Sequence, residues 1–279
     1  MAQELAPINI TPETCFVPGT HKGKGRRTAV APGDTAARYL HYGRITLDGG
    51  DAPISFQNND HETGLVCLNG AARVSTAGQA FELSRYDALY IPRDSEIQVQ
   101  AKGAEGCDLA EMSAPVAKRY PIQFVAYADV RQNPKLHLIA GKPPAERDLN
   151  ILIGGNVDAG RIMAGVTFST PGNWTSWPPH EHSRMLEEAY LFIDMPAPAF
   201  GVQFVYTNPE KPVLTPEMSY TPPEIARVSD APGEHPVGLV IHFRVEPSSS
   251  ANVNESPFPL PSSNDPLAMS KLSEFVSIP

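Results

Sequence analysis

GLVCLNGAARVSTAGQAFELS, residues 64–84, forms the centre of a stretch from Tyr39 to Ala114 in which short apolar segments alternate with turns. The segments are rich in Val, Ile, Leu and Tyr, as β-strands are. Between them lie Asp-Gly-Gly, Ala-Gly-Gln and Pro-Arg-Asp, which are turn sequences. Strands this short and this evenly spaced predict an all-β barrel or sandwich.

A second block with the same plan runs from Leu149 to Val245. Both blocks contain a strand that ends in proline, at residues 86–92 and 224–232, which predicts two β-barrels related by internal duplication. The 29 prolines disfavour long helices, and no long amphipathic helix supports an α/β fold. The predicted organisation is an N-terminal extension (1–37), a first barrel (38–125), a linker (126–148), a second barrel (149–246) and a Pro/Ser-rich tail (247–279).

The charge of the 279-residue chain is acidic, with 22 basic and 31 acidic residues. This balance argues against a general binder of nucleic acid or of anionic membranes, and the basic run at 22–27 is expected to be a solvated face. Cys15, Cys67 and Cys107 lie far apart, and we see neither a secretory signal nor an apolar run that could span a membrane. We therefore expect a cytoplasmic protein whose cysteines are small buried side chains.

The segment that carries chemistry is PGNWTSWPPHEHSRMLEEAYLF, residues 171–192. His180 and His182 project to the same side of an extended chain, and a glutamate at the start of the next strand can close on them. Residues 232–235, PGEH, form a tight turn that supplies a third imidazole, His235. Three imidazoles and one carboxylate predict a site for a divalent metal that keeps coordination positions open for catalysis.

Two adjacent glutamates compete for the carboxylate role. Strand alternation places Glu188 with Tyr190 on one face and Glu187 on the other, where it would meet solvent or an arginine. The face that carries Tyr190 is the better candidate for a polar site, so we favour Glu188 and keep Glu187 as the alternative. Structural or surface roles are expected for the histidines that lack such company, which are His21, His41, His61, His137 and His242.

This arrangement resembles the KduI/IolB family of bicupin sugar-acid isomerases. The resemblance rests on PGNWTSWPPHEH followed by LEEAY, and on DALYIPRDSEI and SAPVAKRYP. It implies two cupin barrels, with the metal in the second one and with His180, His182, Glu188 and His235 as ligands. The first barrel has His61 and Glu62, but Ser95 and Glu96 stand where the PGxH half of a site would be, so we predict that it binds no metal.

The resemblance also implies an activity, the aldose–ketose isomerisation of a deoxy-uronic acid. The first candidate substrate is 5-deoxy-glucuronate, as in inositol breakdown, and the second is 5-keto-4-deoxyuronate. Zinc is the expected cofactor, and manganese, iron and nickel also accept this ligand set. The alternatives are a cupin dioxygenase and a non-catalytic sugar-binding cupin.

Four further residues are candidates for contact with a small anionic sugar. Tyr190 could act as an acid or an orienting group, although a tyrosine of the barrel core is an equal interpretation. Arg184 and Arg161 could bind a carboxylate, since arginine offers bidentate geometry. Trp177 could form a wall of the pocket. Because cupins associate through barrel edges, we also expect a homo-oligomer.

Overall fold

The computed structural model describes residues 12–169, 173–174, 187–194, 201–202, 219–220 and 239–245. Short strands dominate this part of the chain, and its helices are α1 (Pro12–Cys15) and α2 (Tyr127–Gln132). Among the described residues, neither helix has the length or the apolar composition that crossing a bilayer requires. The all-β class expected from the sequence is confirmed.

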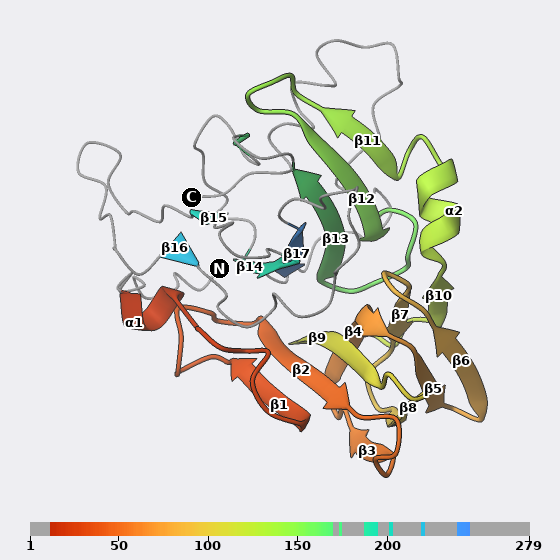
Figure 1. Ribbon diagram of the computed structural model, residues 1–279. Coiled ribbons are helices and arrows are strands. Elements are labelled where there is room, and N and C mark those ends of the chain that lie inside the picture. The colour runs from red at the N-terminus through yellow and green to blue at the C-terminus, as the bar shows by residue number, and fades with distance from the viewer. Residues whose placement is uncertain are drawn as a thin grey trace.

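The first barrel consists of a six-stranded sheet and a four-stranded sheet, drawn from orange to olive in Figure 1. The larger sheet has the order β1 (Gly25–Val30), β2 (His41–Leu47), β9 (Cys107–Pro115), β4 (His61–Gly70), β7 (Ala88–Ile91), β10 (Gln123–Val125). The smaller sheet has the order β3 (Ile54–Gln57), β8 (Glu96–Ala101), β5 (Ala72–Thr76), β6 (Gln79–Leu83).

Alternation of apolar and polar residues directs one face of each strand into this barrel. In β8, Ile97 and Val99 are buried while the glutamate and glutamines between them are exposed. The interior is aliphatic and includes Ile45, Leu65 and Leu89, which have no exposed surface. Burial of this apolar surface is the main term that stabilises the barrel.

The second barrel is described through a five-stranded sheet, drawn in green to blue in Figure 1. Its order is β11 (His137–Ala140), β12 (Arg147–Ile153), β13 (Ile162–Ser169), β17 (Leu239–Val245), β14 (Glu187–Ile193). A separate pair of short strands is formed by β15 (Gly201–Val202) and β16 (Ser219–Tyr220).

The two larger sheets contain four neighbouring strands in the same order. In the first, β1-β2-β9-β4 are neighbours, and in the second β12-β13-β17-β14 follow the same antiparallel sequence. The register matches as well, because Ser113 pairs with both His41 and Thr63, just as Arg244 pairs with both Met163 and Glu188. The duplicated plan inferred from the sequence thus gives two cupin barrels, with Thr63 and Glu188 at equivalent positions.

Both sheets begin earlier in the chain than the sequence suggested. Strand β1 lies within the segment 1–37 that we assigned to an extension, and β11 lies within the linker 126–148. The basic residues of β1 obscured its strand character, since they pair within the fold: Arg26 donates to Glu111 at 2.7 and 2.8 Å and lies over the ring of Phe56. The expectation of a solvated basic face is therefore wrong for Arg26.

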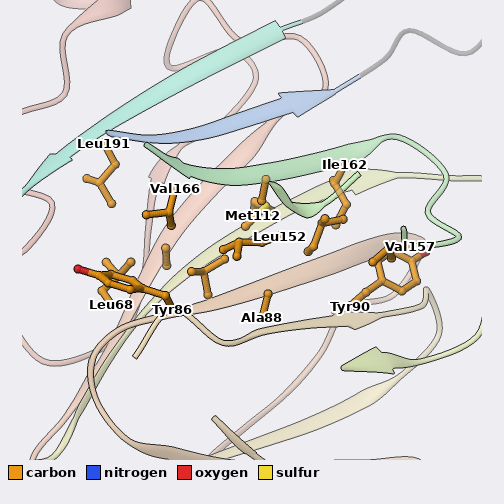
Figure 2. Packing of buried hydrophobic residues seen from close by; sticks show 14 of the residues in the cluster. Leu68, Tyr86, Ala88, Tyr90, Met112, Leu152, Val157, Ile162, Val166 and Leu191 are labelled. Atoms are coloured by element: carbon orange, nitrogen blue, oxygen red, sulfur yellow. The ribbon is translucent and has the colours of Figure 1, made fainter. Parts of the chain in front are cut away.

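The two barrels pack against each other through the outer faces of their large sheets (Figure 2). Leu152, Ile162, Val166 and Leu191 of the second sheet meet side chains of the first. The partners in the first barrel are Leu68, Ala88, Tyr90 and Met112 of its large sheet and Tyr86 of the turn before β7. Because this apolar cluster covers the outer face of the second sheet, a functional site on that sheet would lie on its inner face.

Two glutamates anchor this interface by accepting backbone hydrogen bonds from the opposite barrel. The carboxylate of Glu62 in β4 accepts the amide N–H groups of residues 160–162 at 2.6–2.8 Å, and Tyr90 Oη donates to it at 2.6 Å. In the same way, Glu187 in β14 accepts the N–H groups of residues 38–40 at 2.9 Å each. We call these two interactions the amide anchors. Each one holds the chain at the start of the second strand of the four-strand order that the two sheets share, which is β2 in the first barrel and β13 in the second.

Removal of the first amide anchor should destabilise the whole fold. Glu62 is fully buried and each of its carboxylate oxygens accepts two hydrogen bonds. In Glu62→Gln the side-chain NH₂ group, itself a donor, would replace one carboxylate oxygen and face the N–H and O–H groups that this oxygen accepts. We therefore expect the free energy of unfolding to fall by about 2–4 kcal/mol. Urea denaturation measures this loss. The matched control is Glu96→Gln at an exposed strand position, and equal midpoints for the two variants would contradict the role of Glu62.

The cysteines should differ sharply in reactivity. Burial raises the pKa of the Cys67 thiol to about 12 and that of Cys107 to about 11, whereas Cys15 is exposed, against our expectation that all three are buried. Because the thiolate is the reactive form, a disulfide reagent at pH 8 should modify Cys15 quickly and the other two only after unfolding. A thiol titration with and without denaturant, with Cys15→Ser as control, checks this; rapid reaction of that variant would contradict it.

Candidate functional site

The inner face of the second large sheet carries the polar residues of the candidate site. Residues alternate along β13, so that Ile162, Ala164 and Val166 pack against the first barrel and Thr167 and Ser169 lie on the other face. Thr167 and Ser169 are nevertheless buried. The inner face is therefore closed off from solvent at this end.

Glu188 and Tyr190 occupy the same inner face on β14. The register pairs Glu188 with Arg244 and Tyr190 with His242, whereas Leu191 and Ile193, on the opposite face, join the core between the barrels. Glu188 Oε2 and Tyr190 Oη are both buried. The structure thus brings together two of the candidate residues that strand alternation had placed on one face.

Glu187 has a different environment from the one we expected. Its carboxylate faces neither solvent nor an arginine but accepts the three amide N–H groups of the second amide anchor. The acceptors of this carboxylate are thereby engaged in joining the two barrels. Sequence alternation separated Glu187 from Glu188 correctly, but it could not reveal a partner segment more than a hundred residues away.

Arg147 is a residue of this face that the sequence analysis missed. It is the first residue of β12, it pairs with Ser169, and it is 2% exposed. Burial lowers the pKa of Arg147, and the nearby phenol of Tyr190 partly offsets this effect. The signal available in the sequence was the charged pair Arg147-Asp148 directly before the apolar strand LNILIG, a pair that we had included in the linker.

Arg161 and Tyr39 contact each other between the barrels. The guanidinium of Arg161 lies over the ring of Tyr39 at 4.7 Å, and its backbone N–H donates to Glu62 at 2.6 Å. The backbone N–H of Tyr39 donates to Glu187, so the two residues have equivalent places in the two amide anchors. This contact gives Arg161 a structural role at the interface.

The remaining predicted site residues lie outside the described residues. They are His180, His182, Arg184, Trp177 and His235. Trp174, on the same segment, is described and is 45% exposed, and its backbone N–H donates to Pro144 O at 2.7 Å. The metal ligand set as a whole therefore stays a prediction.

The first barrel has neutral groups where the second has a carboxylate. Thr63 stands at the position equivalent to Glu188, and its hydroxyl accepts a hydrogen bond from Asn58 Nδ2 at 3.3 Å. The same amide donates to Pro92 O, and its oxygen accepts the N–H of Ser95. Below this network the interior is aliphatic. These contacts are consistent with the prediction that the first barrel binds no metal.

Of the four predicted metal ligands, Glu188 is the one that lies among the described residues. Within them, no cluster of three or more His, Cys, Asp or Glu side chains could hold a metal ion. A buried carboxylate on an inner barrel face, as found for Glu188, is a suitable donor for a divalent cation, and the imidazoles would come from the segments around residues 180 and 235. Glu188 is therefore a suitable donor for a metal, and the complete ligand set stays a prediction.

Comparisons with known proteins agree on one family. A model described as the KduI/IolB family matches residues 16–239. A 4-deoxy-L-threo-5-hexosulose-uronate ketol-isomerase of Bacillus pumilus (strain SAFR-032) is 28% identical over 184 residues, 60% of this chain and 66% of the relative. A 5-deoxy-glucuronate isomerase of Halalkalibacterium halodurans is 28% identical over 228 residues, 75% of this chain and 80% of the relative.

A solved structure is similar over most of the chain. It is an IolB-like protein from Salmonella typhimurium LT2, with a TM-score of 0.63 and 17% identity, and the match covers 84% of this chain and 92% of that one. This likeness supports the fold. The matched stretch spans about two thirds of the first ketol-isomerase relative.

Substitutions of the two adjacent glutamates should have different effects on metal content and on stability. Glu188→Gln should lose bound divalent metal, because a neutral amide is a much weaker ligand, and keep most of the stability. Glu187→Gln should keep the metal but lower the free energy of unfolding by about 1–3 kcal/mol through the lost amide anchor. Elemental analysis and urea denaturation of both variants check this. The reverse pattern would make Glu187 the ligand.

Proposed function

Because the chain belongs to the KduI/IolB family, we propose that it is a metal-dependent aldose–ketose isomerase of a deoxy-uronic acid. We take 5-deoxy-glucuronate as the first substrate and 4-deoxy-L-threo-5-hexosulose-uronate, a 5-keto-4-deoxyuronate, as the second. Relatives that carry each of these names align with this chain, and the alignment with the 5-deoxy-glucuronate isomerase of Halalkalibacterium halodurans is the longer of the two described above.

The observation that carries this proposal is the contrast between the two barrel interiors. The first is filled with aliphatic side chains. The second places a carboxylate, a phenol and a guanidinium, those of Glu188, Tyr190 and Arg147, on one inner face, where Glu188 Oε2, Tyr190 Oη and the guanidinium are buried. A cluster of polar and titratable groups on the inner face of a barrel is a candidate site for a polar substrate.

The reaction moves one hydrogen from the hydroxyl-bearing carbon to the neighbouring carbonyl carbon and one proton from that hydroxyl to the carbonyl oxygen, without net oxidation. A divalent metal held by His180, His182, Glu188 and His235 supplies electrophilic stabilisation of the substrate oxygens when it is bound. Zinc suits this task because no redox change is needed. Among the chain's own residues, we assign to Tyr190 the orientation or protonation of the carbonyl oxygen, since its hydroxyl is buried on the face that carries Glu188.

Part of the inner face of the second sheet is shielded from solvent. Thr167 and Ser169 are buried on this face, and the register places them at and beyond the level of Phe192. Nearer the site, Glu188 Oε2 and Tyr190 Oη are buried, and electrostatic interactions are stronger where water is excluded. Each barrel interior is closed on one side by its large sheet, which the amide anchors hold in place.

Nuclear magnetic resonance of each uronate incubated with metal-loaded protein tests the proposal. We expect the signals of one aldose to be replaced by those of its ketose, and we expect His180→Ala to reduce the rate at least about 100-fold with loss of metal. His137→Ala is the matched control, because His137 contacts Asp148 on the opposite side of the sheet.

Three results would count against the isomerase. Full activity after removal of the metal would contradict the metal site. Oxygen consumption by the iron-loaded protein would favour a cupin dioxygenase. Binding of a uronate without turnover by metal-replete protein would favour a sugar-binding cupin.

A further inference from the structure

Arg147 is a buried cation without an internal partner in the described part of the chain. Its side chain is almost completely buried, yet Nε and Nη2 have no hydrogen-bond acceptor among the described residues. Buried polar groups in folded proteins are nearly always hydrogen-bonded, and buried charges are paired. A guanidinium in this state needs an explanation.

The same protein shows how it satisfies another buried arginine. Arg44 is 3% exposed, and its Nε and Nη2 donate to the two carboxylate oxygens of Asp108. Burial opposes the charge of Arg44, but Tyr42 and Asp108 together raise its pKa, whereas burial lowers the pKa of Arg147. Arg147 therefore exposes to the barrel interior the same pair of donors that Arg44 uses to bind a carboxylate.

The position of Arg147 in the sheet places its side chain on the inner face, the one that carries Glu188 and Tyr190. It pairs with Ser169, and residues of the alternate parity, such as Leu152 and Val166, pack against the first barrel. The carboxylate of its neighbour Asp148 already binds Arg131 at 2.7 Å. Tyr190 lies close enough to Arg147 to influence its charge.

We propose that Arg147 binds the carboxylate of the sugar acid in the second barrel, with Nε and Nη2 each donating to one carboxylate oxygen. The proposal rests on the function proposed above and adds to it the residue that selects an acid over a neutral sugar. Adjacent N–H groups on one edge of a guanidinium match the spacing of carboxylate oxygens. A buried, prepositioned arginine also loses little conformational freedom when the substrate binds.

Arg161 and Arg184, the arginines that the sequence suggested for the same task, stay predictions. The guanidinium of Arg161 lies over the ring of Tyr39, and its Nη1 is buried without an acceptor among the described residues. Arg147, by contrast, lies on the face that carries Glu188 and Tyr190.

Substitution of Arg147 should raise KM for the uronate much more than it lowers kcat. We expect Arg147→Met to raise KM about 100-fold or more with unchanged metal content, and Arg147→Lys to raise it about 10-fold, since lysine keeps the charge but not the paired donors. Arg131→Met, which removes a guanidinium from the opposite side of the sheet, should leave KM unchanged. A KM for Arg147→Met within about two-fold of the wild-type value would overturn the proposal.

A neutral analogue tests the chemistry of the contact directly. In 5-deoxy-glucose a hydroxymethyl group replaces the carboxylate of 5-deoxy-glucuronate. The wild-type protein should prefer the acid by about 100-fold in kcat/KM, and Arg147→Met should lose that preference. An unchanged preference in the variant would assign the carboxylate to another residue.

Stability separates substrate binding from a structural role. Because Nε and Nη2 of Arg147 have no acceptor among the described residues, Arg147→Met should unfold at the same or a higher urea concentration than the wild type. Arg44→Met, which leaves Asp108 unpaired, should unfold at a lower concentration. Equal destabilisation by the two substitutions would show that Arg147 is a structural residue and would overturn the proposal.

Failure of the proposed function would be recognised separately. If the metal-loaded wild type turns over neither uronate, calorimetry with D-glucuronate still tests Arg147. Binding by the wild type that is lost in Arg147→Met would support the carboxylate contact in a non-catalytic cupin, and equal binding by both proteins would overturn it.

Discussion

The structure depends on two reciprocal interactions between a buried carboxylate and three consecutive backbone amides. Glu62 and Glu187 lie in equivalent strands, β4 and β14, and each holds the chain at the start of a strand of the other barrel, β13 and β2 respectively. A carboxylate in such a position must keep its hydrogen bonds, because an unpaired buried charge is far more costly than the bonds are favourable. The apolar cluster between the sheets could tolerate small shifts, but the amide anchors accept only one relative placement of the barrels.

This constraint explains why two glutamates stand side by side at the start of β14. One position in the pair is needed for the amide anchor in both barrels, as Glu62 and Glu187. The next position points into the barrel, and there the two copies differ: it is Thr63 in the first barrel and Glu188 in the second. The two copies therefore share the contact that joins the barrels and differ at the inner position. The interior of the first barrel is aliphatic, and the described inner face of the second carries polar groups.

Much of this arrangement follows from local patterns in the sequence. Turn residues and short apolar segments predicted the strands, and alternation in EEAYLFI separated Glu187 from Glu188 and joined Glu188 to Tyr190. Contacts between distant segments were beyond such reasoning. The partners of Glu187 are at residues 38–40, and the ion pair that folds β1 into the sheet joins Arg26 to Glu111. The three predicted imidazole ligands lie outside the described residues and stay predictions.

Arg147 illustrates why sequence reasoning misses such a residue and why a structure reveals it. In the sequence it is one charged residue between a turn-rich segment and an apolar strand, and that position alone does not identify a binding residue. In the fold it is a buried guanidinium, and its environment can be compared with that of Arg44 in the same molecule. Arg44 increases stability because its partner is part of the chain. Arg147 has no such partner among the described residues, so its burial lowers stability. A cost of this kind persists where function requires it, and an anionic substrate that supplies the missing acceptor would offset it each time it binds.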